Sequence, residues 1–447
     1  MKKIYCIIAL ILLVLASGCG KQEDIKESAI NKDNDTVILA GYRQLAPGNK
    51  DAYYCSSSLG VWEPLITKDK DNKPAPCLAQ SWEMQDNGKI WIFHLRKNVL
   101  FHNGTKFNAD SVIANFDRMK KGVKRSTFYG LNIDAFYPSL LKYEKIDDYT
   151  VKLTFKEANI NELYKMTDFG SPIYAPECFA EDGNFKTFAI GTGPYRIIEN
   201  KLNSHVKIER YDNYWGEKGK IKTFIVRKIP NTDARYAALK SGEIDGVTDL
   251  NAIPTVNILN YCSPGYKEFP VRHDLQEAKR LAHEVLGDKR VEIVYGINGA
   301  EPLQKGEAEI IAYWLKDIGL DVKIRVLEYA TLLKMIRKGE CNIVRLQKGL
   351  ANGDPYTALY PFVMPDGALN KNNSVAYENN EIVELMNEVK HTTDEQKRRE
   401  IFNRIQEIAV EEQPVVPLFN DMAIAATSSR IKNYGAINKI ELVTDDE

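Results

Sequence analysis

A strand, a helix and a second strand follow one another between residues 291 and 326, and this succession constrains the fold more than any other feature. Residues 291–295 and 322–326 are β-like runs, and residues 307–318 between them place apolar side chains at helical spacing. Such a succession is typical of a βαβ unit, in which the helix connects the two strands. With further helical patterns at 274–286 and 328–338, the sequence predicts an α/β lobe here.

A second α/β body precedes this lobe. Residues 91–95 and 151–155 alternate apolar and polar side chains as half-buried strands do, and Asn108 precedes a helical apolar face. The remaining predicted elements are strands at 206–210 and 224–226, a helix at 233–240 ended by Gly242, and a charged helix at 381–411 followed by a Pro-rich break at 413–417. Two α/β lobes with such a late crossing leave a cleft between them, where small ligands usually bind.

The composition is that of an ordinary globular protein. The 447 residues suffice for two or three domains, and 60 Lys and Arg against 61 Asp and Glu leave a formal charge of -1. Such a chain has no global positive field to hold polyanions, so no nucleic acid is expected as a partner. The 6 histidines are scattered, and no GxSxG, HExxH or P-loop motif occurs, so the sequence predicts no enzyme.

The first 35 residues are predicted to export the chain and to tether it. Lys2 and Lys3 precede an apolar run at 4–16, which is too short to span about 30 Å of hydrocarbon but suits a secretory leader. The run ends in LASGC at 15–19, which resembles the bacterial lipoprotein box. Residues 1–18 are therefore interpreted as a signal peptide, Cys19 as the lipidated mature N-terminus, and 19–35 as a flexible tether. An uncleaved N-terminal anchor helix is the alternative.

The other cysteines of the mature chain are odd in number: Cys55, Cys77, Cys178, Cys262 and Cys341. No CxxC pair or Cys/His cluster with zinc spacing occurs, so no structural metal site is predicted. Small buried hydrophobic side chains are the favoured interpretation for most of them, and one or two disulfides remain open for an exported protein.

Three motifs together carry a specific resemblance. They are GTGPY at 191–195, ERYDNYWG at 209–216 and DARYAAL at 233–239, and they resemble those of the peptide/nickel-type solute-binding proteins of ABC importers, solute-binding protein family 5. Agreeing segments are WEPL at 62–65, PCLAQSW at 76–82, FHNG at 101–104 and GEID at 242–245. Glycine, proline and packed aromatic rings fix turns and corners, so Tyr195, Tyr214 and Trp215 are interpreted as scaffold.

The resemblance implies an α/β, two-lobed periplasmic-binding-protein-like (type II) fold with an extra subdomain in lobe I. Lobe I is expected to take residues 36–265, with the subdomain at about 62–174, and to be completed by 413–447. Lobe II is expected to take 266–412. Family members carry a crossing strand, a helix and a long loop in the interval that here runs only from Asp245 to Asp274. Lobe II is therefore expected to be shortened.

The runs IGTGP at 190–194, KLN at 201–203 and NYWGEK at 213–218 are similar to the nickel-binding branch in particular, which captures its metal as a chelate. RSTFYGL at 125–131 matches the subdomain stretch in which an arginine pairs with chelator carboxylates, and this implies that role for Arg125; a surface arginine is an equal alternative. The branch also uses a lobe II histidine as a metal ligand, but the matching stretch at 364–374 has no histidine. No metal ligand or cofactor of the protein is therefore predicted, and a nickel chelate would have to supply its own donors.

NGDP at 352–355 resembles the lobe II loop of dipeptide binders, in which a nearby aspartate accepts the peptide ammonium. That place is taken here by Ala351, so a peptide needs another acceptor, for which Asp354 is the candidate. A turn residue ahead of Pro355 is the alternative role of Asp354. The candidate ligand-binding residues are Arg125, Phe128, Tyr129, Asn352, Asp354, Tyr356 and Tyr42, with Phe128 and Tyr129 equally compatible with the subdomain core.

The resemblance thus implies an extracytoplasmic lipoprotein, anchored to the cell membrane at a cell surface or in a periplasm. It would capture a nickel chelate or a short peptide in the interlobe cleft and deliver it to ABC permease and ATPase subunits. A truncated or sensory paralogue that binds a ligand or partner without transport is the alternative. A secreted hydrolase would need a nucleophile and a base converging in the cleft, which the sequence does not display.

Overall fold

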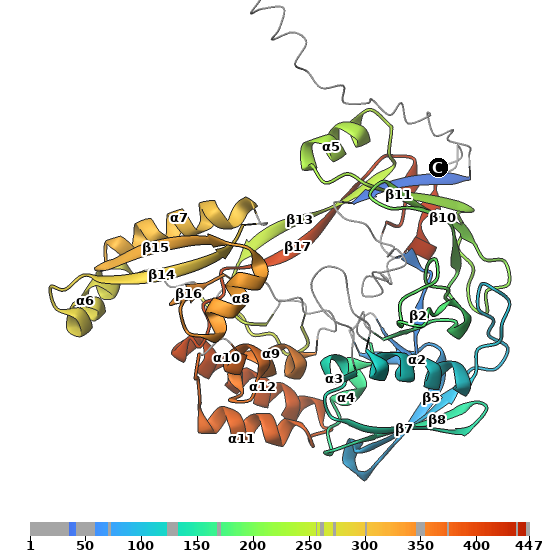
Figure 1. Cartoon of the computed structure of the whole chain (residues 1–447), viewed down its shortest axis with the longest axis horizontal. Helices are drawn as coiled ribbons and strands as arrows, with labels where there is room; N and C mark the ends of the chain where they lie inside the picture. The colour runs from blue at the N-terminus through green and yellow to red at the C-terminus, as the bar shows by residue number, and fades with distance from the viewer. Residues whose placement is uncertain are drawn as a thin grey trace, which may run out of the picture.

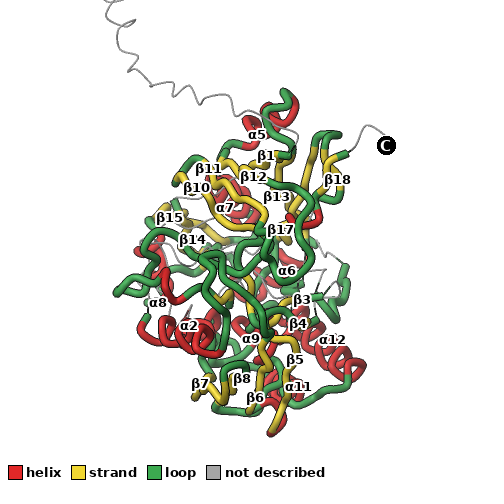
Figure 2. The backbone as a smooth tube through the Cα atoms, turned by 90° about the vertical axis from the view of Figure 1, so that its right-hand side faces the viewer, coloured by secondary structure: helices red, strands yellow, loops and turns green. Residues whose placement is uncertain are grey.

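The computed structural model describes residues 35–41, 59–69, 73–122, 133–167, 171–255, 257–259, 263–270, 274–299, 302–345, 354–372, 375–434 and 437–443. These residues form several sheets and a helical cluster (Figure 1). Figure 2 shows the six-stranded and the four-stranded sheets at opposite ends of the molecule. Within the described part of the chain, no helix combines the length and the apolar character needed to cross a membrane.

The largest sheet has six strands in the order β10-β11-β12-β1-β13-β17. Its strands are β10 (Tyr195–Lys201), β11 (His205–Arg210), β12 (Thr223–Lys228), β1 (Thr36–Gly41), β13 (Gly246–Pro254) and β17 (Phe419–Thr427). The central β1 pairs in parallel with β12 and β13, and it is buried over nearly its whole length because both of its faces are covered. Val37 and Leu39 belong to the large core, whereas Ile38 and Ala40 belong to a smaller cluster that includes Ala238 of α5 (Thr232–Lys240).

A four-stranded antiparallel sheet has the order β5-β6-β8-β7. Its strands are β5 (Ala79–Gln85), β6 (Ile90–Leu95), β8 (Thr150–Phe155) and β7 (Leu140–Asp147). Every second side chain of β6 and β8 is buried, so the alternation in the sequence predicted both strands correctly. Helix α2 (Ala109–Lys121) packs on this sheet through Val112 and Phe116. It begins with a capping box, in which Asn108 Oδ1 accepts the Ser111 N–H at 3.1 Å and Ser111 Oγ accepts the Asn108 N–H at 3.4 Å.

The predicted βαβ unit is confirmed. It consists of β14 (Val291–Asn298), α7 (Pro302–Lys316) and β15 (Leu320–Leu327), and the two strands pair in parallel from Val291 opposite Leu320 to Asn298 opposite Leu327. The short β16 (Ile343–Val344) completes a three-stranded sheet of order β15-β14-β16. Helices α6 (Leu275–Leu286) and α8 (Tyr329–Arg337) flank it, as predicted.

A helical cluster follows this sheet in the chain. It comprises α9 (Pro355–Val363), α10 (Ala368–Asn372), α11 (Asn380–Val389) and α12 (Glu395–Glu412), and its core includes Leu359, Met386 and Phe402. The single helix predicted at 381–411 is wrong, because the structure has two helices there with a break at 390–394. Asp394 explains the break, since its side chain accepts the Lys397 N–H at 2.7 Å and caps the start of α12.

The remaining elements are short. They are β2 (Glu63–Pro64), β3 (Ile66–Lys68), β4 (Pro74–Pro76), β9 (Pro172–Ile173), β18 (Ile431–Lys432), β19 (Glu441–Leu442), α3 (Ile133–Phe136), α4 (Glu162–Lys165), η3 (Asp86–Gly88), η4 (Pro176–Cys178) and η5 (Ile437–Lys439).

Two long strands connect the six-stranded sheet with the rest of the molecule. β13 and β17 pair antiparallel over nine positions, from Gly246 opposite Thr427 to Pro254 opposite Phe419, and Figure 1 shows both running towards the three-stranded sheet. After β13 the chain packs against α12, where the buried Gln406 binds Asn257 and Lys267. The chain leaves the six-stranded sheet through β13 and re-enters it through β17.

Three of the cysteines lie in the described residues, and all three are free thiols. Cys77 and Cys178 are buried, as expected for small hydrophobic side chains, and Cys341 is partly exposed. Cys55 and Cys262 lie outside the described residues.

Candidate functional site

Most of the predicted ligand-binding residues lie outside the part of the chain that the structure describes. These are Tyr42, Arg125, Phe128, Tyr129 and Asn352, and the predicted lipidation site Cys19 is outside it as well. Asp354 and Tyr356 are described, and both lie at the start of α9.

Asp354 is completely buried and caps α9. Its Oδ2 accepts hydrogen bonds from the backbone N–H of Thr357 at 2.9 Å and from the Thr357 hydroxyl at 2.7 Å. Burial raises the pKa of the carboxyl, although these hydrogen bonds oppose the rise. The Asp354 side chain therefore caps the N-terminus of α9, which is close to the turn role that the sequence left open. Its contact with a ligand stays a prediction.

Tyr356 is only 3% exposed and belongs to the core of the helical cluster. Its ring lies 5.4 Å from the ring of Tyr360, measured between centroids, and burial raises the pKa of its phenol. In this structure the Tyr356 side chain packs in the core of the helical cluster. Its contact with a ligand stays a prediction.

Glu63 is the centre of a buried hydrogen-bond network that joins the family-like motifs. Its carboxylate accepts bonds from Tyr214 OH at 2.7 Å, from Trp215 Nε1 at 2.9 Å and from Thr192 Oγ1 at 2.7 Å. Burial is the largest influence on this carboxyl and raises its pKa, although the three donors lower it. The motifs at 191–195 and 209–216 are therefore both bonded to one carboxylate of the motif at 62–65.

Arg96 completes this network. Its guanidinium lies 4.5 Å from the centre of the Trp215 ring, and its Nε donates to the Cys77 carbonyl at 2.6 Å. The sequence singled out the segments containing Glu63 and Cys77 by resemblance but did not identify the Glu63 carboxylate or Arg96 as network members. The sequence shows only an acid among apolar neighbours in WEPL, and its partners are far away along the chain.

The glycines of GTGPY bring two backbone segments into close contact. An ideal Cβ at Gly191 would lie 2.0 Å from the Val61 carbonyl oxygen, and one at Gly193 would lie 2.3 Å from that of Gly60. The same loop accepts hydrogen bonds from His102, whose backbone N–H meets the Gly191 carbonyl at 2.9 Å and whose Nε2 meets the Gly193 carbonyl at 2.9 Å. Burial lowers the pKa of His102 to about 4, so the ring is neutral at pH 7. The motif is scaffold, in agreement with the interpretation of its residues.

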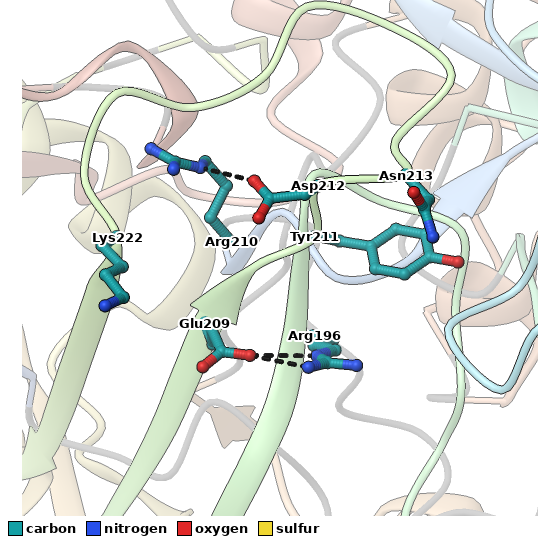
Figure 3. Close-up of a pocket in the computed structure, with 7 residues that line it drawn as sticks. All are labelled: Arg196, Glu209, Arg210, Tyr211, Asp212, Asn213 and Lys222. Atoms are coloured by element: carbon teal, nitrogen blue, oxygen red, sulfur yellow. Dashed lines mark hydrogen bonds and ion pairs between the residues drawn. The ribbon is translucent and has the colours of Figure 1, made fainter.

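A polar depression of about 260 Å³ lies on β10, β11 and the loop that follows them (Figure 3). Its charged groups are largely paired with one another: Arg196 Nη2 lies 2.8 Å from Glu209 Oε1, and Arg210 Nε lies 3.1 Å from Asp212 Oδ1. These pairs involve four of the five charged side chains in the wall, and Lys222 is the fifth. Over the described residues, no group of three His, Cys, Asp or Glu side chains is placed to hold a metal ion.

A family model provides the decisive comparison. The model described as bacterial extracellular solute-binding proteins, family 5, middle, matches residues 73–256 and 251–370. The chain belongs to this family. Its members bind solutes outside the cytoplasm and are not enzymes, which confirms the family resemblance of the motifs.

Individual relatives differ in what their names say they bind. Heme-binding protein A of Haemophilus influenzae is 25% identical over an alignment of 472 positions, gaps included, which covers 85% of each chain. The nickel-binding periplasmic protein of Escherichia coli is 32% identical over 194 residues, which cover 41% of this chain and 35% of the relative.

A solved structure shows the fold of this family member. The periplasmic binding protein DppA of Helicobacter pylori, in complex with the peptide STSA, superimposes with a TM-score of 0.73 at 20% identity, and the match covers 91% of this chain and 98% of that one. The chain therefore has the α/β periplasmic-binding-protein fold. The buried network around Glu63 and the glycine contacts are part of the scaffold of a solute-binding protein.

Proposed function

We propose that this family 5 protein is the substrate-binding lipoprotein of an ABC importer, anchored to the cell membrane through Cys19. It captures a small ligand between two lobes and delivers it to the permease and ATPase subunits. The family match carries this proposal, and the name of the H. pylori structure, an ABC transporter-associated protein, supports it. The LASGC segment supports the lipid anchor.

Strand membership supports the proposed division into lobes. Lobe I comprises residues 36–265, with a subdomain at about 62–174, and 413–447 complete it; lobe II comprises 266–412. The six-stranded sheet takes β1 and β10–β13 from the first part of the chain and β17 from its last part. The four-stranded sheet lies within the subdomain range, and the three-stranded sheet and the helical cluster lie within lobe II. The ligand would enter between these two lobes.

The ligand is a nickel chelate or a short peptide. The names of similar proteins support both classes, since one relative is a nickel-binding protein and one solved structure holds a peptide. A third similar protein is named a heme-binding protein, so heme is a further ligand to test. We place Arg125 on a ligand carboxylate, with Phe128, Tyr129 and Tyr42 as further contacts from lobe I. Asn352, Asp354 and Tyr356 are the proposed contacts from lobe II. An arginine fork binds a carboxylate bidentately in either ligand class.

Two observations support a shortened lobe II. The alignment with the heme-binding protein spans 472 positions, which exceeds the 447 residues of this chain and therefore includes gaps in it. The family model matches in two pieces that overlap at 251–256, next to the end of β13. This overlap lies within the interval from Asp245 to Asp274, in which a segment is expected to be missing. The alternative function, a truncated or sensory paralogue without transport, follows from the same observations.

A thermal-shift screen on the body from Thr36 tests the proposal. The ligands are Ni(II) alone, histidine alone, Ni(II) together with histidine, heme, and a library of di- to pentapeptides. At 100 times the dissociation constant, a ligand stabilises the folded state by about 2.7 kcal/mol, which raises the melting temperature visibly. A shift with Ni(II) and histidine together, but with neither alone, identifies a nickel-chelate receptor, and a shift with peptides identifies a peptide receptor. No shift with any of these ligands contradicts the proposed capture and favours the truncated paralogue.

Arg125 provides the residue-level test. Arg125→Ala should weaken binding of the identified ligand by about 2 kcal/mol, because a buried carboxylate loses its partner. Lys124→Ala is the matched control, since it removes the neighbouring positive charge. Equal effects of the two substitutions would remove Arg125 from the site.

A further inference from the structure

The subdomain and the helical cluster meet along a polar seam. On the subdomain side the seam includes residues 157–162, around the start of α4, and on the other side it includes Lys390 and Arg398, at the end of α11 and in α12. An exposed ion pair between Lys73 and Glu395 also joins the two sides. Ile160 donates its backbone N–H to the Lys390 carbonyl at 3.1 Å, and Arg398 Nη2 donates to Asn161 Oδ1 at 2.7 Å. Lys390 Nζ also lies 3.5 Å from Glu157 Oε2. Figure 1 shows α4 on the side of the subdomain that faces the helical cluster.

Arg398 is held in position by its own lobe. Its Nη1 donates to the carbonyls of Val389 at 2.9 Å and Thr392 at 3.1 Å, in the turn between α11 and α12. The guanidinium also lies 5.5 Å from the centre of the Phe402 ring. These contacts fix the planar group, so its second nitrogen can reach across the seam at a small entropic cost.

Asn161 is fixed in the same way from the subdomain. It is completely buried, and both its backbone N–H and its side-chain amide donate to Asn159 Oδ1, at 3.0 and 2.8 Å. Asn159 in turn approaches the buried carboxylate of Glu162 at 3.4 Å. The acceptor for Arg398 is therefore organised by residues of the subdomain alone.

The buried apolar side chains of the two sides belong to separate clusters. Leu163 and Met166, next to the seam, belong to the large core of lobe I, whereas Phe402 and Tyr356 belong to the core of the helical cluster. Separating the two sides along the seam exposes polar groups that water can bind, while each hydrophobic core stays intact.

We propose that this seam is a latch, in which the bonds from Arg398 to Asn161 and from Ile160 to Lys390 form when the lobes close and break when they open. The latch adds to the stability of the closed state and thereby sets the retention of any ligand held between the lobes. The inference rests on the proposed function, because it assumes that the two lobes move relative to each other.

Amide hydrogen exchange at Ile160 in the whole chain, measured without any ligand, tests the latch. The Phe155 N–H, which binds the Lys89 carbonyl at 2.8 Å within the subdomain, is the internal reference. In Arg398→Gln the Ile160 amide should exchange at least about tenfold faster, because a charge-assisted bond across the seam is lost. Phe155 should exchange at the wild-type rate.

Two further variants control for indirect effects. Arg404→Gln lies on the same helix and removes an arginine that pairs with Glu381 inside the helical cluster, so it should leave the Ile160 rate unchanged. Asn161→Ala removes the acceptor without touching the turn that Arg398 also binds, and it should increase the rate as Arg398→Gln does. Small-angle scattering should show a larger radius of gyration for both latch variants.

A rate at Ile160 that neither latch variant changes would overturn the latch, because the closed state would then not depend on the seam. Equal acceleration at Phe155 would also overturn it, because the variants would then loosen the subdomain as a whole. None of these results depends on a ligand, so a failed latch leaves ligand capture intact. Conversely, a negative ligand screen leaves the exchange result valid.

Discussion

At the scale of single residues, the family motifs bring backbone segments and buried polar groups into close contact. Gly191 and Gly193 let a loop approach the backbone of residues 60 and 61, and Glu63 collects three hydrogen bonds from the other motifs. A side chain at either glycine would collide with the backbone of residues 60 and 61. A neutral residue in place of Glu63 would leave three buried donors without their acceptor. These positions are therefore sensitive although they lie outside the predicted ligand site.

Gly193→Ala tests the close contact. The new Cβ would lie 2.3 Å from the Gly60 carbonyl oxygen, so the backbone must shift, and we expect a loss of about 1–3 kcal/mol in the free energy of unfolding. Gly306→Ala is the matched control: no atom lies within 4 Å of an ideal Cβ at this position of α7, and alanine should stabilise the helix by about 1 kcal/mol. Chemical denaturation measures both. A neutral Gly193→Ala would contradict the contact.

His102 makes the stability of lobe I depend on pH. Its pKa in the folded state is lowered to about 4, below the value of about 6.5 for an unfolded chain. Between these values the unfolded state binds more protons, so the contribution is complete above pH 6.5 and is lost as the pH falls towards 4. We expect a loss of about 3 kcal/mol over this range, since one pKa unit corresponds to about 1.4 kcal/mol. His102→Gln keeps a donor for the Gly193 carbonyl and should flatten this part of the profile; an unchanged profile would contradict the assignment.

The sequence predicted the structural roles of some of these residues but not of others. Tyr195, Tyr214 and Trp215 were correctly interpreted as scaffold, because glycine, proline and aromatic residues in short runs have local consequences. The role of Glu63 could not be predicted, since its partners Thr192 and Tyr214 lie 129 and 151 positions away. Asp354 had two roles open, and only the geometry of α9 reveals the cap.

At the scale of elements, local patterns predicted most of the longer helices but only some of the strands. Alternation predicted β6 and β8, and the apolar spacing predicted the βαβ unit, because both patterns express one buried face. The break between α11 and α12 was missed because the charged residues on both sides favour helix, and the capping bond of Asp394 decides the boundary. The pairing of β13 with β17 joins segments about 170 positions apart along the chain, and no local pattern predicts it.

Gln406 holds the segment after β13 against α12, and its loss should be costly. The buried amide accepts bonds from Asn257 Nδ2 at 2.8 Å and from the Lys267 N–H at 2.9 Å, and it donates to the Gly265 carbonyl at 2.8 Å. Gln406→Leu removes these three bonds from a buried site, and Asn257 Nδ2 keeps only its bond to the Lys267 carbonyl. We therefore expect a loss of about 3 kcal/mol in the free energy of unfolding. Gln396→Leu on the same helix removes only an exposed bond to Glu400 and should change stability by less than about 0.5 kcal/mol. Similar losses would contradict this role of Gln406.

At the scale of the whole molecule, the hydrophobic interior is divided. The large core includes Phe93 and spans the four-stranded and six-stranded sheets, whereas Phe402 belongs to the separate core of the helical cluster. The strands β13 and β17 and the polar seam connect the parts. Polar contacts couple the unfolding of two units less strongly than a shared hydrophobic core does. The unit with the large core and the helical cluster are therefore expected to unfold separately.

Differential scanning calorimetry of the ligand-free protein should therefore show two transitions. Phe402→Ala removes a ring from the helical cluster and should lower only one of them, and Phe93→Ala should lower only the other, each by an amount that corresponds to about 3–5 kcal/mol. A ligand bound between the lobes contacts both parts and should raise both transitions and bring them together. If either substitution lowered both transitions equally in the ligand-free protein, the two cores would form one cooperative unit. The lobes would then be too strongly coupled for the seam alone to control their closure.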